Sequence, residues 1–270
     1  MRISALTPVG PGRDAWLADT ARSVSACRSV AGARGVELEW VVCLDGAPEP
    51  DGLPVDPDRL VRLVAARGVS TARNAALAAA TGDWVLPLDA DDLLDDSGFD
   101  EVVRQVQRVH QETGWLGFNR LLVDGGRTPY WIGAERSYAV GALAQSWTSP
   151  FPFHPNSAVL RRELILSIGG WPAMLNEDIA ALLLVGEEAA GAVHPAVLTR
   201  YRVWDGQLTA ALAYHPDKVT AFATMEAMVN ARRRRAGRLP VVPPDVSEPR
   251  DLRSAARSGD GRDGARHDGQ

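Results

Sequence analysis

Short apolar runs alternate with helical patterns through the first hundred residues, and this alternation limits the fold more than any other feature of the sequence. The expected strands are residues 3–6, 38–44, 60–64 and 84–88. The expected helices are residues 14–30, 69–80 and 97–112. Strands that alternate with helices in this way form βαβ units. The sequence therefore predicts an α/β fold with a mostly parallel, Rossmann-like central sheet flanked by helices, and Ser97 is expected to cap the third helix.

The second half of the chain is less regular. Its expected strands are residues 116–123, 157–160 and 196–203, and its expected helices are residues 176–188 and 217–234. Residues 238–270 are rich in Pro, Gly, Asp and Arg, and from Glu248 onward five Arg are balanced by four Asp and one Glu. Because this segment has almost no large apolar side chains, we expect a disordered tail after a single folded domain over residues 1–237.

Composition excludes several classes of protein. A net charge of -5 and a pI of about 5.6 provide no basic field to hold nucleic acid. Cys27 and Cys43 have neither disulfide-framework nor zinc-site spacing, which favours a reducing compartment. The start of the chain lacks the apolar core of a signal peptide, and residues 179–185 fall short of the roughly 20 residues that span a bilayer. We therefore expect a cytoplasmic protein with no integral membrane segment.

Polar residues follow each of the four early strands. They are Thr7 and Pro8 after the first, Asp45 and Gly46 after the second, Arg67 and Gly68 after the third, and Asp89, Asp91 and Asp92 after the fourth. In an open parallel sheet the carboxyl ends of the strands lie along one edge, where ligands bind. The four segments are therefore expected to meet at one site. Asp45 with Gly46 is also compatible with an ordinary turn.

Three acids of this set lie close together in the sequence. Residues i and i+2 of an extended segment point the same way, so Asp89 and Asp91 can face one ligand. A hard divalent cation that keeps waters and shares phosphate ligands suits such a sparse carboxylate set. The alternative is a solvated turn before the Ser97 helix, since acids gather at helix starts.

Arg73 is unusually placed for a charged residue. At 100° per residue it falls on the same helical face as Val69, Leu77 and Ala80, which should pack on the sheet. It also lies in the first turn, where the helix dipole disfavours a cation. Arg73 therefore requires an anion, which is either a carboxylate such as Asp89 or a bound diphosphate.

A second acidic group precedes the helix expected over residues 176–188. Asn176, Glu177 and Asp178 follow a Gly-Gly-Trp-Pro sequence that begins at Gly169. One interpretation is structural, with Asn176 as the helix cap and the two acids facing the helix dipole. The other is that one carboxylate, Asp178 by preference, is a general base.

The sequence GVSTARNAALAAATGDWVLPLDADD at residues 68–92, with GGWPAMLNED at residues 169–178, resembles the family 2 glycosyltransferases. The resemblance covers roughly residues 3–209. It implies a GT-A type fold with a nucleotide-binding half over about residues 1–95 and an acceptor half over about 96–237. It also implies transfer of a sugar, hexosyl in type and with inversion, from a nucleotide-diphosphate donor to an unidentified acceptor. A UDP-sugar is the first expectation for that donor, and the acceptor is a small molecule, a glycan or a lipid-linked molecule.

The resemblance also implies roles for individual residues. Donor binding would fall to Thr7, Pro8, Asp45, Arg67, Arg73 and Asp89. Asp91 would ligate Mn²⁺ or Mg²⁺ between the two phosphates. Asp178 would be the catalytic base, with Glu177 as the alternative, and Gly170 and Trp171 would border the acceptor or the transferred sugar.

Two departures from the family pattern stand out. The late segment YRVWDGQLT has Trp204 where the family often has a His that helps to hold the diphosphate or the metal, and that role could pass to Asp205 or His215 or be absent. Pro87 removes a ladder donor from the fourth strand just before the acids. A nucleotidyltransferase and a catalytically silent nucleotide-sugar-binding protein are the alternative functions.

Overall fold

The computed structural model describes residues 1–123, 125–126, 131–147, 151–204 and 217–244. Its strands are β1 (Arg2–Val9), β2 (Glu37–Asp45), β3 (Arg59–Leu63), β4 (Trp84–Pro87), β5 (Leu93–Leu94), β6 (Thr113–Leu122), β7 (Arg136–Tyr138), β8 (Ala158–Arg161) and β9 (Ala190–Tyr201). The α-helices are α1 (Leu17–Ala33), α2 (Val69–Ala79), α3 (Asp96–Arg108), α4 (Ala142–Gln145), α5 (Arg162–Ser167), α6 (Glu177–Glu188) and α8 (Asp217–Arg235). Two 3₁₀ turns, η1 (Asp14–Trp16) and η2 (Pro155–Ser157), complete the described elements.

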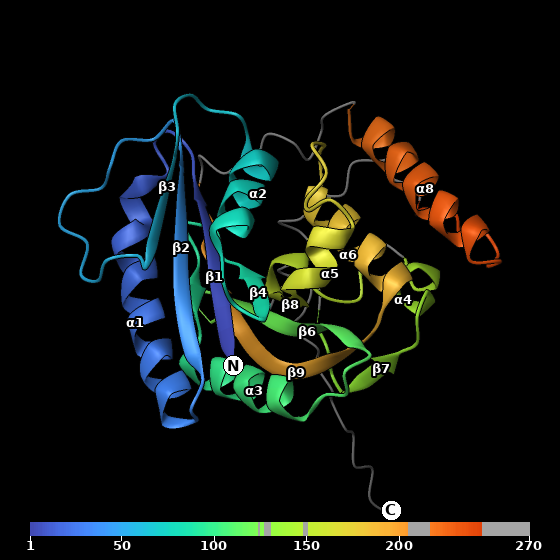
Figure 1. The fold of residues 1–270 in the computed structure, drawn as a ribbon, viewed down its shortest axis with the longest axis horizontal. Coiled ribbons are helices and arrows are strands. Elements are labelled where there is room, and N and C mark those ends of the chain that lie inside the picture. Colours follow the sequence, from blue (N-terminus) through green and yellow to red (C-terminus); the bar gives the residue numbers. More distant parts are fainter. Residues whose placement is uncertain (124, 127–130, 148–150, 205–216, 245–270) are drawn as a thin grey trace, which may run out of the picture.

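The described residues form a nine-stranded sheet in the order β3-β2-β1-β4-β8-β6-β9-β5, with β7 paired to β9. The first four strands in this order are parallel, as expected from the βαβ pattern. Beyond β4 the sheet is mixed, because β8 runs antiparallel to both β4 and β6 while β6 and β9 are parallel. The α/β fold is therefore confirmed, and its parallel part is the half formed by the first hundred residues (Figure 1).

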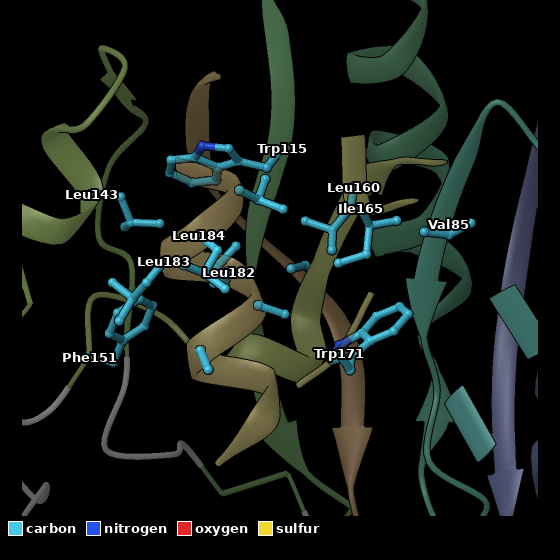
Figure 2. Packing of buried hydrophobic residues seen from close by; sticks show 14 of the residues in the cluster. Val85, Trp115, Leu143, Phe151, Leu160, Ile165, Trp171, Leu182, Leu183 and Leu184 are labelled. Carbon is cyan, nitrogen blue, oxygen red and sulfur yellow. The ribbon is translucent and has the colours of Figure 1, made fainter. Parts of the chain in front are cut away.

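Helices cover both faces of the sheet and bury two separate cores. Side chains of β1 and β2 alternate between the faces, and β1 is buried from Ile3 to Val9, as expected for a strand covered on both sides. One core lies under α1 and α3 and contains Trp40 and Phe99. The other lies under α2, α5 and α6, where Trp115, Trp171 and Leu183 pack together (Figure 2).

Several element boundaries differ from the sequence-based expectation. β1 extends to Val9, and β4 ends at Pro87, which cannot donate to a ladder. The cap of α3 is Asp95, whose carboxylate accepts a hydrogen bond from the Gly98 amide, so the expectation of Ser97 as cap was wrong. Asn176 is the N-cap residue of α6, but its side chain makes no capping hydrogen bond, so this part of the structural interpretation was wrong, whereas Glu177 and Asp178 do lie in the first turn.

The packed part of the chain continues past residue 237. Arg233 of α8 is 1% exposed and donates to the Glu187 carboxylate, and Arg238 donates to the same carboxylate. Val241 is buried and exchanges two backbone hydrogen bonds with the Asn230 amide group. α8 is thereby held against α6, at the right of Figure 1. Residues 245–270 lie outside the described residues, so the disordered tail stays a prediction.

No helix within the described ranges combines the length and the apolar character needed to cross a bilayer.

Candidate active site

Most of the polar segments expected to converge lie at the carboxyl edge of the parallel strands. The segment after β1 differs from the expectation. Because β1 runs to Val9, Thr7 and Pro8 lie inside the strand, and the expectation that they follow it was wrong. Thr7 is fully buried and its hydroxyl accepts a hydrogen bond from Trp40 Nε1 at 2.9 Å. The loop that follows β1 begins at Gly10 and carries Arg13.

Asp45, the last residue of β2, fixes the turn that leads into α2. Its two carboxylate oxygens accept hydrogen bonds from the backbone amides of Arg67 at 2.6 Å and Gly68 at 2.8 Å. Gly46 allows the chain to leave β2 here, because a Cβ would lie 2.6 Å from the Ala66 nitrogen. With the turn held by its backbone, the Arg67 side chain is exposed at the edge of the sheet.

Arg73 joins the two acidic segments of the sequence. The residue is 2% exposed, and its guanidinium forms ion pairs with Asp89 at 2.6 Å and with Glu177. Burial acts against the charge, but Asp89, Glu177 and Asp178 keep the pKa of Arg73 above its ordinary value. The carboxylate alternative for Arg73 is thus the one observed. Since Glu177 lies 104 positions further along the chain, this cation ties the start of α6 to the end of β4.

The acids after β4 are in three different environments. Asp89 bonds to Arg73 through one oxygen and accepts from Asn156 Nδ2 through the other at 2.6 Å. Asp92 is 1% exposed and accepts from the Arg202 amide. Asp91 accepts a hydrogen bond from Trp204 Nε1 at 2.7 Å through Oδ2 alone.

Asp91 and Asp92 form no ion pair among the described residues, and burial and the charge of nearby acids raise the pKa of both. The pKa of Asp91 is raised, first by burial and then by Asp89. The pKa of Asp92 is raised well above its ordinary value, again by burial and then by Asp89. Two carboxylates that repel each other in a partly buried site are stabilised in their ionised form by a cation.

The residues present fit a divalent cation that takes most of its ligands from water and from the phosphates of a substrate. Within the described ranges, no group of three His, Cys, Asp or Glu side chains could hold an ion by itself. Mg²⁺ and Mn²⁺ sites in phosphate-handling enzymes use one or two carboxylates together with waters and substrate phosphates. Asp91 offers the required carboxylate, because its Oδ1 is not used by another side chain among the described residues.

Asn74, next to Arg73 on α2, holds the loop before α6. Its Nδ2 donates to the Trp171 carbonyl and its Oδ1 accepts from the Trp171 amide, both at 2.8 Å. Gly170 is required beside it, since its φ is +81° and a Cβ would lie 2.2 Å from Asn74 Oδ1. The Trp171 ring is 2% exposed and packs in the core, so this segment faces the site with its backbone (Figure 2).

We expect Asn74→Ala to reduce the free energy of unfolding by about 2 kcal/mol, because two hydrogen bonds are lost and the Trp171 peptide groups lose their partners. We also expect a fall in turnover, since the loop before α6 then loses its link to α2 and the start of α6 keeps only the Glu177–Arg73 ion pair as a polar link to that helix. Urea unfolding followed by circular dichroism measures the first effect. Asn119→Ala, which removes a comparable amide-to-backbone pair away from this loop, is the matched control. A stability loss in Asn74→Ala with unchanged turnover would contradict the positioning role.

The start of α6 is strained. Asn176 has φ 56° and ψ 40°, and among the described residues it is the only non-glycine with a positive φ. Left-handed backbone at a non-glycine residue costs free energy and is concentrated at functional sites. The next residue, Glu177, is buried and neutralised by Arg73, whereas Asp178 is partly exposed and has no ion-pair partner within the described ranges.

The pKa of Asp178 is raised. Burial is the main cause, Arg73 and the Ile179 amide oppose it, and Asp89 adds to it. The Asp178 carboxylate therefore lies near both Arg73 and Asp89 while its proton affinity is increased. These are properties of a general base close to a donor site.

Three residues at this site were missed by the sequence reading or left without a role. Asn156 precedes β8 and donates to Asp89, Trp204 follows β9 and donates to Asp91, and Arg13 lies 4.8 Å from the centroid of the Trp204 ring. Of the three, only Trp204 is marked in the sequence, because it departs from the family pattern. Asp205 and His215, the other candidates at that position, lie outside the described residues.

Comparisons with known proteins concern the family and the fold. Residues 55–168, which include Arg73, Asp89 and Asp91, match the model of the family described as glycosyl transferase family 2. No curated protein matches the sequence.

Solved structures share the fold at low sequence identity. TarS 1-349 from S. aureus in complex with UDP-GlcNAc is 14% identical with a TM-score of 0.62, over 86% of this chain and 66% of that one. The mannosyltransferase PcManGT from Pyrobaculum calidifontis, in complex with GDP-Man and Mn²⁺, is 18% identical with a TM-score of 0.59, over 85% and 64%. The chain thus spans slightly less than two thirds of the length of these proteins. Residues 55–168 thus resemble glycosyl transferase family 2, and the described chain has the GT-A fold of the solved structures.

Proposed function

We propose that the protein transfers a hexosyl group from a nucleotide-diphosphate sugar to an acceptor hydroxyl, with inversion at the anomeric carbon and with a divalent cation. A UDP-sugar is the proposed donor, since TarS structures contain UDP or UDP-GlcNAc, and a GDP-sugar is the alternative because PcManGT contains GDP-Man. The domain that carries this activity is proposed to be residues 1–237.

One observation carries the proposal. Buried Arg73 pairs with Asp89 at the end of β4 and with Glu177 at the start of α6, so it holds the strand-end acids and the candidate base in one site. In this proposal the Arg73 guanidinium lies between a donor side at Asp89 and an acceptor side at the start of α6. A single acidic turn could not provide both.

The donor side combines acids and exposed cations. Asp91 would hold the metal, with Asp89 fixed by Arg73 and Asn156, and the exposed Arg67 would face the nucleotide. The divalent cation supplies Lewis-acid stabilisation of the departing diphosphate. Thr7, Pro8 and Asp45 contribute here by shaping the wall of the nucleotide site, since Asp45 already holds the turn before α2.

The acceptor side supplies the base. Burial raises the pKa of Glu177 to about 7, although Arg73 opposes this rise. We assign the role to Asp178 over Glu177, because Glu177 is buried and bonded to Arg73, while Asp178 is partly exposed and has no ion-pair partner among the described residues. Asp178 takes the proton of the acceptor hydroxyl as its oxygen forms a bond to the anomeric carbon. The bond from that carbon to the diphosphate breaks on the opposite face, and a nucleoside diphosphate leaves. Gly170 and the Trp171 backbone border this side.

A panel of donors tests the proposal. We expect UDP-GlcNAc, UDP-glucose or GDP-mannose to raise the melting temperature in MnCl₂. Ligand at 100 times Kd adds about 2.7 kcal/mol, and each kcal/mol corresponds to roughly 2 to 4 °C for a domain of this size. EDTA should remove most of the shift, and the stabilising donor should release its nucleoside diphosphate slowly in water.

Asp51→Asn, which changes an exposed acid of the β2–β3 connection, should keep the full shift. Failure of every nucleotide sugar to stabilise the protein in the presence of metal would reject the proposal. Stabilisation without hydrolysis or transfer would indicate a silent binding protein, and pyrophosphate release from a nucleoside triphosphate would indicate a nucleotidyltransferase.

A further inference from the structure

Two residues from opposite ends of the domain meet beside Asp91. Trp204 follows β9 and donates its indole N–H to Asp91 Oδ2 at 2.7 Å. Arg13 comes from the loop between β1 and η1, and its guanidinium carbon lies 4.8 Å from the centroid of the same indole ring. The indole N–H of Trp204 thus contacts the candidate metal ligand Asp91, and the indole ring contacts the Arg13 guanidinium.

Among the described residues Arg13 forms no ion pair, in contrast to Arg73 and Arg202, although its charge opposes the rise that burial causes in the pKa of nearby Asp91. Arg73 pairs with Asp89 and Glu177, and Arg202 pairs with Asp19. Arg13 forms no ion pair or side-chain hydrogen bond with any residue that the structure describes. It is nevertheless only partly exposed, so its position is defined by the surrounding chain and by the Trp204 ring.

The position of Arg13 suits an anion that arrives with a ligand. A guanidinium that lies over an aromatic ring keeps N–H donors available, and these donors match the oxygens of a phosphate group. Arg13 also precedes η1 and α1, whose N-terminal end faces the carboxyl edge of the sheet and favours negative charge. Asp91 interacts with Arg13 electrostatically but accepts no hydrogen bond from it, so the N–H donors of Arg13 are not used by this carboxylate.

We propose that Arg13 binds the diphosphate of the donor, and that Trp204 is a positioning residue for both Arg13 and Asp91. The inference rests on the proposed function and adds to it a second cationic contact for the leaving group, supplied by the loop after β1. Trp204 thus acts on the diphosphate indirectly. Its ring positions Arg13, and its N–H positions Asp91. The Arg13 guanidinium would then face the negative charge that develops on the diphosphate.

Binding measurements separate a diphosphate contact from a general effect. Isothermal titration of UDP and of uridine, in MnCl₂, is compared for the wild type and Arg13→Ala, with GDP and guanosine as a parallel pair. We expect Arg13→Ala to weaken the nucleoside diphosphate about tenfold, the size of one charge-assisted hydrogen bond. The nucleoside should bind within twofold of the wild type. Arg104→Ala, which removes an arginine on α3, is the matched control and should change neither.

Two Trp204 variants test the positioning role. Trp204→Phe keeps a ring for stacking and loses the N–H, so Arg13→Ala should still cost about tenfold in that background. Trp204→Leu removes the stack, so adding Arg13→Ala to it should weaken UDP by less than twofold. Melting temperatures within 2 °C of the wild type, roughly one kcal/mol or less, are required of each variant before its affinity is compared.

The outcomes distinguish this inference from the proposed function. If the wild type binds UDP or GDP but Arg13→Ala binds it equally well, the inference is overturned and the proposed function stands. Equal weakening of the diphosphate and the nucleoside in Arg13→Ala also overturns it, because the loss then concerns the loop and not a phosphate contact. If the wild type binds neither nucleoside diphosphate, the proposed function itself fails.

Discussion

Asp178→Asn is expected to lower the rate of sugar transfer by roughly 10²- to 10⁴-fold, the contribution of a positioned general base. Donor affinity should change little, because Asp178 lies at the start of α6 and forms no ion pair with the described residues. Single-turnover transfer to the acceptor, once a donor is known, measures the rate, and titration with the donor measures the affinity. Asparagine is nearly isosteric with aspartate but cannot accept the proton.

The same carboxylate should determine the acid limb of the pH profile. The pKa of Asp178 is raised by burial, and the base must be ionised, so activity should begin to fall at a higher pH than for an ordinary aspartate. Glu177→Gln is the informative comparison. It should cost stability through the loss of the Arg73 ion pair, but it should leave the acid limb in place. Wild-type turnover in Asp178→Asn, with metal and donor bound, would reject the assignment of the base.

Asp91→Asn is expected to lower transfer by about 10³-fold. Two unit charges roughly 4 Å apart at an effective dielectric of about 20 interact by about 4 kcal/mol, which is nearly three decades of rate when it acts only in the transition state. The variant should also need a higher concentration of MnCl₂ for half-maximal donor binding, because a neutral amide is a weaker ligand than a carboxylate. Partial recovery of binding at high MnCl₂ is therefore expected.

A control close in sequence shows whether the effect belongs to Asp91. Asp96→Asn changes an exposed acid in the first turn of α3 and should leave both the rate and the metal requirement unchanged. Unchanged dependence on MnCl₂ in Asp91→Asn would show that Asp91 is not the metal ligand. Sugar transfer by the wild type at the same rate without a divalent cation would show that the reaction does not use one.

Much of the fold follows from local patterns. Apolar runs and helical periods place β1 to β4 and α1 to α3 within a few residues of their observed ends, because strand and helix periodicities are set by neighbours in the sequence. The placement of Arg73 on the buried face of α2 also follows from helical geometry, and so does its need for an anion. The errors concern the boundaries of elements: Thr7 lies near the end of β1, and Ser97 and Asn176 lie at the starts of α3 and α6, where several polar groups compete for the same amides.

The sequence by itself determined the α/β fold, the acids after β4 and the demand of Arg73 for a counter-charge. Only the tertiary structure decided which carboxylates pair with Arg73, namely those of Asp89 and Glu177. Asn74 meets Trp171 across 97 positions and Trp204 meets Asp91 across 113, and neither pairing leaves a periodic trace in the sequence. The physical reason is that such contacts depend on how β8, β6 and β9 are ordered beside β4, and that order is set by the packing of whole elements.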